Sequence, residues 1–379
     1  MDDGIGLVLA GDVMTGRGVD QILRSPGKPE LHEEYVRDAR RYVELAERVN
    51  GPIPRGVEPT WPWGSALEAM EQYGPAVRVM NLETSVTTSD DVALGKAVNY
   101  RMAPANLEVL NVAGVDVWTL ANNHVLDYGA TGLLQTLDTL ADAGQRAPGA
   151  GRDAAEAWRP AVVGLPSPDA PDHARHGGGR VVIASVADVS SGVPGGWRAA
   201  PDRAGVALLP DLSLTTADEV ARRLLEVERP GDIRVVSIHW GSNWGYGIPH
   251  EHRRFAHRLV EAGVHVVHGH SSHHPRPIEV YRGRLVLYGC GDLVNDYEGI
   301  GGYAGFRSEL RLLYSARLAM GTGELVGLQM TPLLARRLTL EHASREDSTW
   351  LARVLDHESH GHGARVRLGG DGRLEVIVR

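Results

Sequence analysis

The stretch VHVVHGHSSHHPRPIEVY, residues 264–281, places a polar cluster directly after a short apolar run. The run is rich in valine and ends at His270, after which two serines and two histidines precede a proline. A short run of branched residues bounded by turn-forming residues is typical of a buried strand. This stretch therefore predicts a strand whose carboxyl end carries several imidazoles.

Similar runs recur along the chain and alternate with helical patterns. Strand-type runs occupy residues 6–10, 76–81, 115–121, 180–187, 233–240 and 264–270. Patterns with apolar residues three or four positions apart predict helices at 131–144, 216–228 and 250–263. Such alternation predicts a layered α/β architecture in which helices cover the sheets.

The pattern changes to hairpins from about residue 278. Turn signals lie at 282–283, 321–323 and 369–372, where glycine supplies the positive φ angles of tight turns. The chain has 379 residues, 42% of them hydrophobic, which is enough for one large core. We predict a single domain over residues 1–379, with a core at about 5–300 and C-terminal hairpin elaborations at 301–379.

Composition and charge exclude several classes of protein. The formal net charge of -9 would repel a phosphate backbone, so no nucleic-acid partner is expected. Cys290 is the single cysteine, which excludes an internal disulfide and a thiolate metal site. The acidic N-terminus is unlike a signal peptide, and no apolar stretch is long enough to span a bilayer. We predict a cytoplasmic protein without a membrane partner; its oligomeric state stays open.

Polar residues follow five of the apolar runs at their downstream ends. They are Asp12, Asn81, Glu83, Asn122, Asn123, His124, His239, His268 and His270. Because the carboxyl ends of parallel strands share one edge of a sheet, these side chains are expected to converge. Each alone is more commonly a cap, a turn residue or a buried histidine, but together they favour a site. Oxygen and imidazole ligands suit calcium, manganese, iron or zinc.

Five motifs together resemble a known family. GDVM (11–14), NLE (81–83), NNH (122–124), HWG (239–241) and GHSSHHPRPIE (269–279) stand in the order found in CapA-like proteins. This is the poly-γ-glutamate synthesis family of the calcineurin-like metallophosphatase superfamily, and the resemblance covers about residues 5–300. It implies a calcineurin-like α/β fold, a four-layer αββα sandwich with a metal site at one edge.

The resemblance also implies roles for individual residues. The implied metal ligands are Asp12, Glu83, Asn123, His239, His270 and His273, and His124 would be a proton donor. Three motifs depart from the metallophosphatase pattern: Asp-x-His is here 12–14 (DVM), GDxxD is replaced by 81–83 (NLE), and GHxH becomes GHSSH. Lost ligands weaken the expectation of a tightly held two-metal hydrolytic centre.

These departures favour proton transfer at carbon. Some soluble CapA-like proteins that this chain resembles are epimerases that invert the Cα of the C-terminal residue of a lasso-peptide precursor. We predict a metal-dependent peptide epimerase acting on such a ribosomally made peptide, with Ca²⁺ as the favoured ion. Its candidate catalytic residues are His124, His270, Asp12, Asp292 and His239. Candidate acid–base pairs are His124 with Asp12 or Asp127, and His270 with Asp292.

Two alternatives stay open. One is a metal-dependent phosphoesterase with Mn²⁺, Fe²⁺ or Zn²⁺, and the other is a non-catalytic role in poly-γ-glutamate or capsule assembly. Trp240, Trp244 and Tyr246 cluster beside His239 and suit a substrate with an apolar group. We predict these three and Arg101 as substrate contacts. The number of ions, and which histidine is the base, are left open.

Overall fold

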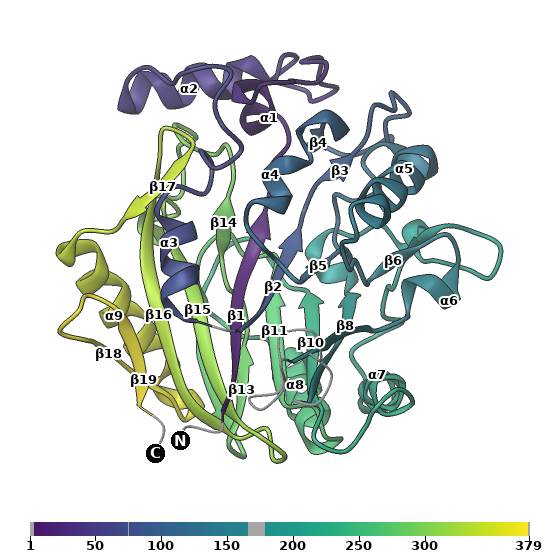
Figure 1. Cartoon of the computed structure of the whole chain (residues 1–379), viewed down its shortest axis with the longest axis vertical. Helices are drawn as coiled ribbons and strands as arrows, with labels where there is room; N and C mark the ends of the chain where they lie inside the picture. Colours follow the sequence, from purple (N-terminus) through teal and green to yellow (C-terminus); the bar gives the residue numbers. More distant parts are fainter. Residues whose placement is uncertain (1–3, 75, 166–178, 378–379) are drawn as a thin grey trace, which may run out of the picture.

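Alternation of side chains along β1 (Gly4–Val13) explains why this strand lies between two hydrophobic cores. Leu7 and Leu9 face the core between the two main sheets, whereas Val8 and Ala10 face a core beneath helices. Successive strand side chains point to opposite faces, so a strand that is apolar throughout must be covered on both sides. The structure, a computed structural model shown in Figure 1, describes residues 4–74, 76–165 and 179–377.

The first sheet contains the N-terminal and the C-terminal strands. In order across the sheet these are β18 (Arg365–Leu368), β19 (Leu374–Ile377), β16 (Leu325–Arg336), β15 (Leu310–Ala319), β1, β2 (Val77–Leu82) and β5 (Val117–Thr119). Two further strands belong to it: β14 (Asp292–Val294) pairs with β1, and β17 (Thr339–His342) pairs with β16. β1, β2, β5 and β14 are parallel, so their carboxyl ends meet at one edge.

The second sheet packs against the first. Its order is β12 (Ile278–Tyr281), β13 (Arg284–Leu287), β11 (Val266–His270), β10 (Ile233–His239), β8 (Arg180–Ala187) and β7 (Ala161–Gly164). β8, β10, β11 and β13 are parallel. Two short pairs lie outside the main sheets: β3 (Ser85–Val86) with β4 (Arg101–Met102), and β6 (Ala150–Gly151) with β9 (Gly205–Val206).

Helices cover the outer faces of both sheets. The helices on the first-sheet side are α1 (Gly18–Ile22), α2 (Arg40–Asn50), α3 (Ser65–Gln72), α4 (Glu108–Asn111) and α5 (Gly129–Asp142). α6 (Ala154–Ala157), α7 (Leu214–Leu225) and α8 (His250–Glu261) contribute to the core of the second sheet's outer face. α9 (Arg345–Ser359) packs beside β18 and adds leucines to the core between the sheets. The predicted four-layer arrangement is confirmed.

The six predicted strands and three predicted helices are all present, with boundaries shifted by a few residues. The hairpins predicted after residue 278 are β12–β13, β15–β16 and β18–β19. Those beyond residue 300 lie within the first sheet, because β15 pairs with β1 from Gly4 to Leu9. No helix in the described part of the chain is long and apolar enough to cross a membrane. The cytoplasmic location stays a prediction.

Candidate metal centre

Asp12 lies where the two sheets come together at their carboxyl edges. It is fully buried, and its register partners are Asn81 on β2 and Asp292 on β14. One carboxylate oxygen accepts from Asn81 Nδ2 at 2.7 Å, and the other accepts from the Ser271 amide at 3.0 Å. A side chain at Gly11 would collide with the Gly291 carbonyl, so glycine permits the close approach of β14. Two strands of the first sheet thus bring acids to one point beside the second sheet.

His239 and His270 end neighbouring strands of the second sheet and face Asp12. They are register partners on β10 and β11, and their Nδ1 atoms lie 2.8 Å apart. These Nδ1 atoms are 3.9 Å and 3.6 Å from Asp12 Oδ1. Separations of this size are too long for hydrogen bonds and resemble those between two ligands of one ion, about 3.4 Å when each lies about 2.1 Å from it.

The contacts of the two rings are compatible with the tautomer that a bound ion requires, with a lone pair on each Nδ1. His239 Nε2 donates to Asn123 Oδ1 at 3.0 Å, so its Nδ1 carries a lone pair. His268 Nε2 donates to the Ala10 carbonyl, and its Nδ1 accepts from the Ser237 hydroxyl. That hydroxyl then accepts from His270 Nε2 at 2.9 Å, which leaves a lone pair on His270 Nδ1 as well. In this tautomer the two Nδ1 lone pairs and a carboxylate oxygen converge; in the other tautomers the 2.8 Å contact between the Nδ1 atoms is a hydrogen bond.

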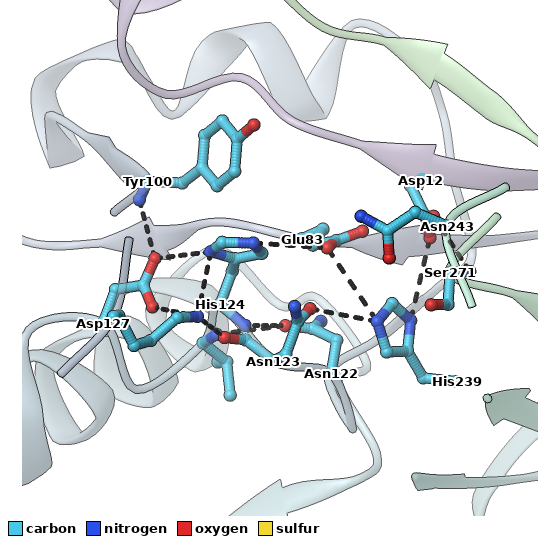
Figure 2. Close-up of polar contacts among 12 residues, drawn as sticks. Asp12, Glu83, Tyr100, Asn122, Asn123, His124, Asp127, His239, Asn243 and Ser271 are labelled. Carbon is cyan, nitrogen blue, oxygen red and sulfur yellow. Dashed lines mark hydrogen bonds and ion pairs between the residues drawn. The ribbon is translucent and has the colours of Figure 1, made fainter. Parts of the chain in front are cut away.

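Glu83 adds a second carboxylate to this group, as Figure 2 shows. Its Oε1 lies 3.9 Å from His239 Nε2 and 3.6 Å from His124 Nε2. Its Oε2 is buried and has no hydrogen-bond partner among the described residues. A buried carboxylate oxygen without a donor is costly unless a cation satisfies it. Asp12, His239 and His270 together fit a hard or borderline divalent ion, and Glu83 and Asn123 lie on the Nε2 side of the His239 ring, where they can support it.

His273 and Asp292 form a neighbouring group that also includes Asp12. His273 Nδ1 donates to Asp292 Oδ1 at 3.0 Å, and Asn295 donates to Asp292 Oδ2 at 2.7 Å. Ser271 has a φ of 95°, and this unusual turn brings both the Ser271 amide and His273 towards the acids. Asp12, His273 and Asp292 can also surround an ion, but their hydrogen bonds already satisfy much of this second group.

His124 stands across Glu83 from the histidine pair and is held by a polar network. Its Nδ1 donates to Asp127 Oδ2 at 2.6 Å, and Asp127 also accepts from the Tyr100 amide. Lys96 Nζ lies 2.7 Å from Asp127 Oδ1 and donates to the Asn123 carbonyl. The ring is thereby oriented with Nε2 towards Glu83.

A cavity of about 200 Å³ opens beside these groups. Its polar lining comprises Glu83, Lys96, Asn123, His124, Asn243, Ser271, His273 and Tyr297. The imidazoles of His124 and His273, each hydrogen-bonded to a carboxylate, therefore line the same cavity. A small polar group of a substrate can reach them together.

Burial controls the ionisation of the centre. Burial and the nearby Asp292 raise the pKa of Asp12 to about 7, and burial together with Asp12 raises the pKa of Glu83 well above its usual range. Burial lowers the pKa values of His239 and His270 far below the ordinary value. Without a cation the acids hold protons and these imidazoles are neutral, so a binding cation displaces protons from the acids.

The affinity for a divalent ion should therefore rise with pH. Below about pH 7 Asp12 keeps its proton, and each proton displaced on binding weakens the apparent affinity about tenfold per pH unit. Isothermal titration with Mn²⁺ should give a Kd that falls as the pH rises from about 6 to about 8. An affinity that is independent of pH, or that strengthens on acidification, would contradict this assignment.

Two predicted catalytic pairs are wrong and one is present. His270 contacts His239 and lies near Asp12, whereas Asp292 pairs with His273. His124 pairs with Asp127, not with Asp12. The sequence did not distinguish His270 from His273 because the turn at Ser271 decides which ring reaches β14.

Trp240, predicted as a substrate contact, is a core residue. It is 1% exposed, stacks on His252 and Tyr288, and donates from its indole nitrogen to the Tyr288 carbonyl at 3.0 Å. Strand alternation explains the error, because Trp240 points to the opposite face from His239.

A Trp240→Ala variant should lose about 3 kcal/mol of stability, since truncating a buried aromatic side chain leaves a cavity. Urea unfolding followed by circular dichroism would measure the change. A midpoint equal to that of the unaltered protein would show that the indole does not contribute to the core.

Arg101 is also misplaced as a substrate contact. Its guanidinium donates to the Ser89 carbonyl and to Asp90 and lies over the Tyr128 ring, so it holds the 88–91 segment. Trp244 stacks on Tyr303 with ring centroids 3.9 Å apart and meets the edge of His273, while Tyr246 contacts His274. Trp244 thus contacts a residue of the cavity lining, and the role of Trp244 and Tyr246 in binding stays a prediction.

Lys96, Ser237 and Asn295 are among the polar residues of the centre that the sequence did not predict. Lys96 comes from an irregular segment, Ser237 from the middle of an apolar strand, and Asn295 from just after β14. Ser237 offered a signal, since a serine within a buried strand needs a hydrogen-bond partner.

The chain was compared with known proteins. A family profile described as bacterial capsule synthesis protein PGA_cap matches residues 6–297. A probable polyglutamine synthesis accessory protein of Mycobacterium tuberculosis is 50% identical over 376 residues, which are 99% of this chain and 96% of that protein. The PGA biosynthesis protein CapA of Bacillus subtilis is 25% identical over 296 residues, 78% of this chain and 64% of that protein.

Among solved structures, a 5'-nucleotidase precursor from Thermus thermophilus is similar with a TM-score of 0.44 and 16% identity. The match covers 87% of this chain and 54% of that one, so the chain spans about half of that structure.

Proposed function

Because the chain belongs to the bacterial capsule synthesis protein family, as its CapA-like motifs predicted, we propose that it is an accessory protein in polyglutamine or polyglutamate synthesis. We further propose that its Asp12 cluster is a divalent-metal centre that hydrolyses a phosphate ester. The polymer comes from the names of the relatives, and the chemistry comes from the geometry of the site.

One observation carries the catalytic part of this proposal. The Nδ1 atoms of His239 and His270 converge on Asp12, and Glu83, whose Oε2 has no partner among the described residues, lines a cavity that also exposes His124. A bound divalent ion would supply positive charge against phosphate oxygens and would lower the pKa of a nearby water. This arrangement is more elaborate than a merely structural polar cluster needs.

The residues around the cavity supply the remaining chemistry. Burial lowers the pKa of His124 to about 4, so its neutral Nε2 can accept the proton of an attacking water. Asp127 keeps the ring in this tautomer and stabilises the imidazolium that forms. Lys96 places a positive charge beside the same cavity, which favours an anionic substrate. His124 is thus a proton acceptor here, in contrast to the donor role expected from the resemblance.

The test is hydrolysis of p-nitrophenyl phosphate and bis-p-nitrophenyl phosphate by protein stripped of metal and reloaded with Mn²⁺, Zn²⁺ or Ca²⁺. We expect nitrophenol release that depends on the added ion and is removed by chelator. The absence of metal-dependent release with all three ions, in folded protein that binds them, would refute the hydrolytic proposal. The role in polymer synthesis would then stand as a separate question.

A second candidate is the predicted peptide epimerase, and a different observation favours it. His124 and His273 line one cavity with opposite pKa shifts: burial lowers the pKa of His124, whereas for His273 burial is outweighed by Asp292 and Asp12 together, which raise its pKa. Inversion at Cα requires one neutral base and one protonated acid. The Asn243 amide, 3.0 Å from His273 Nε2, can turn to accept the proton of that acid.

Incubation of Ca²⁺-loaded protein with a candidate peptide or a glutamyl polymer in deuterated water separates the two candidates. The epimerase proposal requires deuterium at a Cα position, detected by mass spectrometry and chiral amino-acid analysis. If the protein hydrolyses a phosphate ester but introduces no deuterium at any Cα of the peptide or polymer, the epimerase proposal is excluded.

A further inference from the structure

A second cavity, of about 380 Å³, lies apart from the His124 cavity. It lies between the end of α2, the segment after β14, the start of β15 and the β16–β17 hairpin, elements labelled in the left and upper parts of Figure 1. Its volume is within the range of small-molecule pockets. Tyr297 lines both cavities, so the two are neighbours.

Arg311 lines this cavity and is short of partners. The residue is 2% exposed, and its Nη2 donates to Asn295 Oδ1 at 2.9 Å. Its Nε and Nη1 are buried and have no hydrogen-bond partner among the described residues. Burial lowers the pKa of Arg311, the direction expected for a desolvated cation with few acceptors. Unmet donors of a buried guanidinium are costly, so a ligand that accepts from them is favoured.

The other charged groups of the cavity are already paired. Arg307 donates to Glu309 at 2.7 Å and to Asp347 at 2.8 Å, and Glu298 accepts from the Leu338 amide at 3.1 Å. Arg336 donates to Asn50 and lies 4.0 Å from Glu341. The lining contains as many arginines as acids, so a singly charged group such as a carboxylate fits better than a doubly charged group such as a phosphate.

We propose that this cavity binds a carboxylate group, with Arg311 as its partner. A guanidinium presents parallel N–H donors that match the two oxygens of a carboxylate. Leu293, Leu334 and Leu338 line the same space and suit the aliphatic part of such a ligand. The carboxylate can belong to a free amino acid or to the end of a glutamyl peptide, and both contain the same group.

The cavity lies next to the metal centre but forms a separate site. Asn295 accepts a hydrogen bond from Arg311 and donates one to Asp292, so the Asn295 side chain lies between the cavity and the metal centre. Carboxylate binding is nevertheless expected without any ion at Asp12, because Arg311 contacts the ligand directly and the ion does not. The proposal therefore stands independently of the hydrolytic one.

The test is isothermal titration of the metal-free 379-residue chain with L-glutamate, with a γ-glutamyl tripeptide, and with L-glutamine, which has a single carboxylate on a molecule of similar size. We expect saturable binding of at least one of the three. Arg311→Met should weaken it about 10- to 100-fold, the range for loss of a charge-assisted hydrogen-bonding partner. If the tripeptide binds more tightly than L-glutamate, the ligand is the end of a polymer. If it binds equally or more weakly, the ligand is a free amino acid.

A second variant covers the case in which Arg311→Met does not fold. Ala335 lines the cavity on β16 and is half-buried, so Ala335→Phe should fill the space and abolish binding while leaving Arg311 in place. Arg336→Met is the matched control, since it removes an arginine of the same cavity that is largely exposed. Absence of binding to the unaltered protein, full binding by Ala335→Phe, or equal losses in the Arg311 and Arg336 variants would overturn the proposal.

Discussion

An Asp12→Asn variant should bind divalent ions on the order of a thousandfold more weakly than the unaltered protein, or not measurably. Replacing a residue that supports a ligand from behind already costs about 10- to 100-fold, and Asp12 is itself the carboxylate that both candidate ligand groups contain. Asparagine has nearly the same shape but no negative charge. The loss of ion affinity thus measures the contribution of the Asp12 negative charge.

The folded state should tolerate this change. Asparagine still accepts one of the two hydrogen bonds that Asp12 accepts from Asn81 and Ser271, so the free energy of unfolding should fall by about 1 kcal/mol. Thermal unfolding of the metal-free protein checks this, and metal content by mass spectrometry together with titration checks binding. Asp138→Asn is the matched control, because Asp138 is 63% exposed in its side chain and contacts Arg152. Unchanged ion binding by Asp12→Asn would show that the centre is misassigned.

A His124→Gln variant should keep its metal and lose turnover. General base catalysis by a positioned imidazole contributes roughly 10²- to 10⁴-fold, and glutamine cannot take up a proton at this position. His124 Nε2 is 3.6 Å from Glu83, and His124 belongs to neither candidate ligand group, so ion binding should change little. On either catalytic proposal, the effect falls on kcat for the preferred substrate.

Two companion variants sharpen the interpretation. Asp127→Asn removes the carboxylate that orients His124, so it should lower kcat by less than His124→Gln and shift the pH profile of kcat. His32→Gln is the control, because His32 is an exposed histidine outside the centre. Full activity of His124→Gln with every substrate that the unaltered protein converts would exclude an acid–base role for His124.

Strand and helix positions were predictable because they depend on local pattern. The runs ending at Asp12, His239 and His270 are short, branched and apolar, and they became β1, β10 and β11. Polar residues at their ends had to meet, since parallel strands of packed sheets place their carboxyl ends at one edge. The grouping of Asp12, Glu83, Asn123, His239 and His270 was therefore foreseeable without coordinates, and their role as ligands stays a prediction, as does that of His273.

Errors arose where a contact depended on the conformation of an irregular segment. Lys96 reaches Asp127 from a segment without strand or helix, and no periodicity marks it. Trp240 follows His239 directly, yet it packs under α8 because neighbouring strand residues face opposite ways. Proximity in sequence gave no information on which of the two faces the site.

The sequence by itself determined the layered architecture and the kinds of donor at the shared edge, because apolar periodicity and residue chemistry are local properties. Only the tertiary structure decided that Asp292 pairs with His273 and that His270 faces His239. It also decided that Arg311 lies buried with unmet donors beside a cavity. These partners come from strands far apart in the chain, so they depend on how the sheets pack and on a turn at Ser271 whose φ of 95° no local pattern predicts.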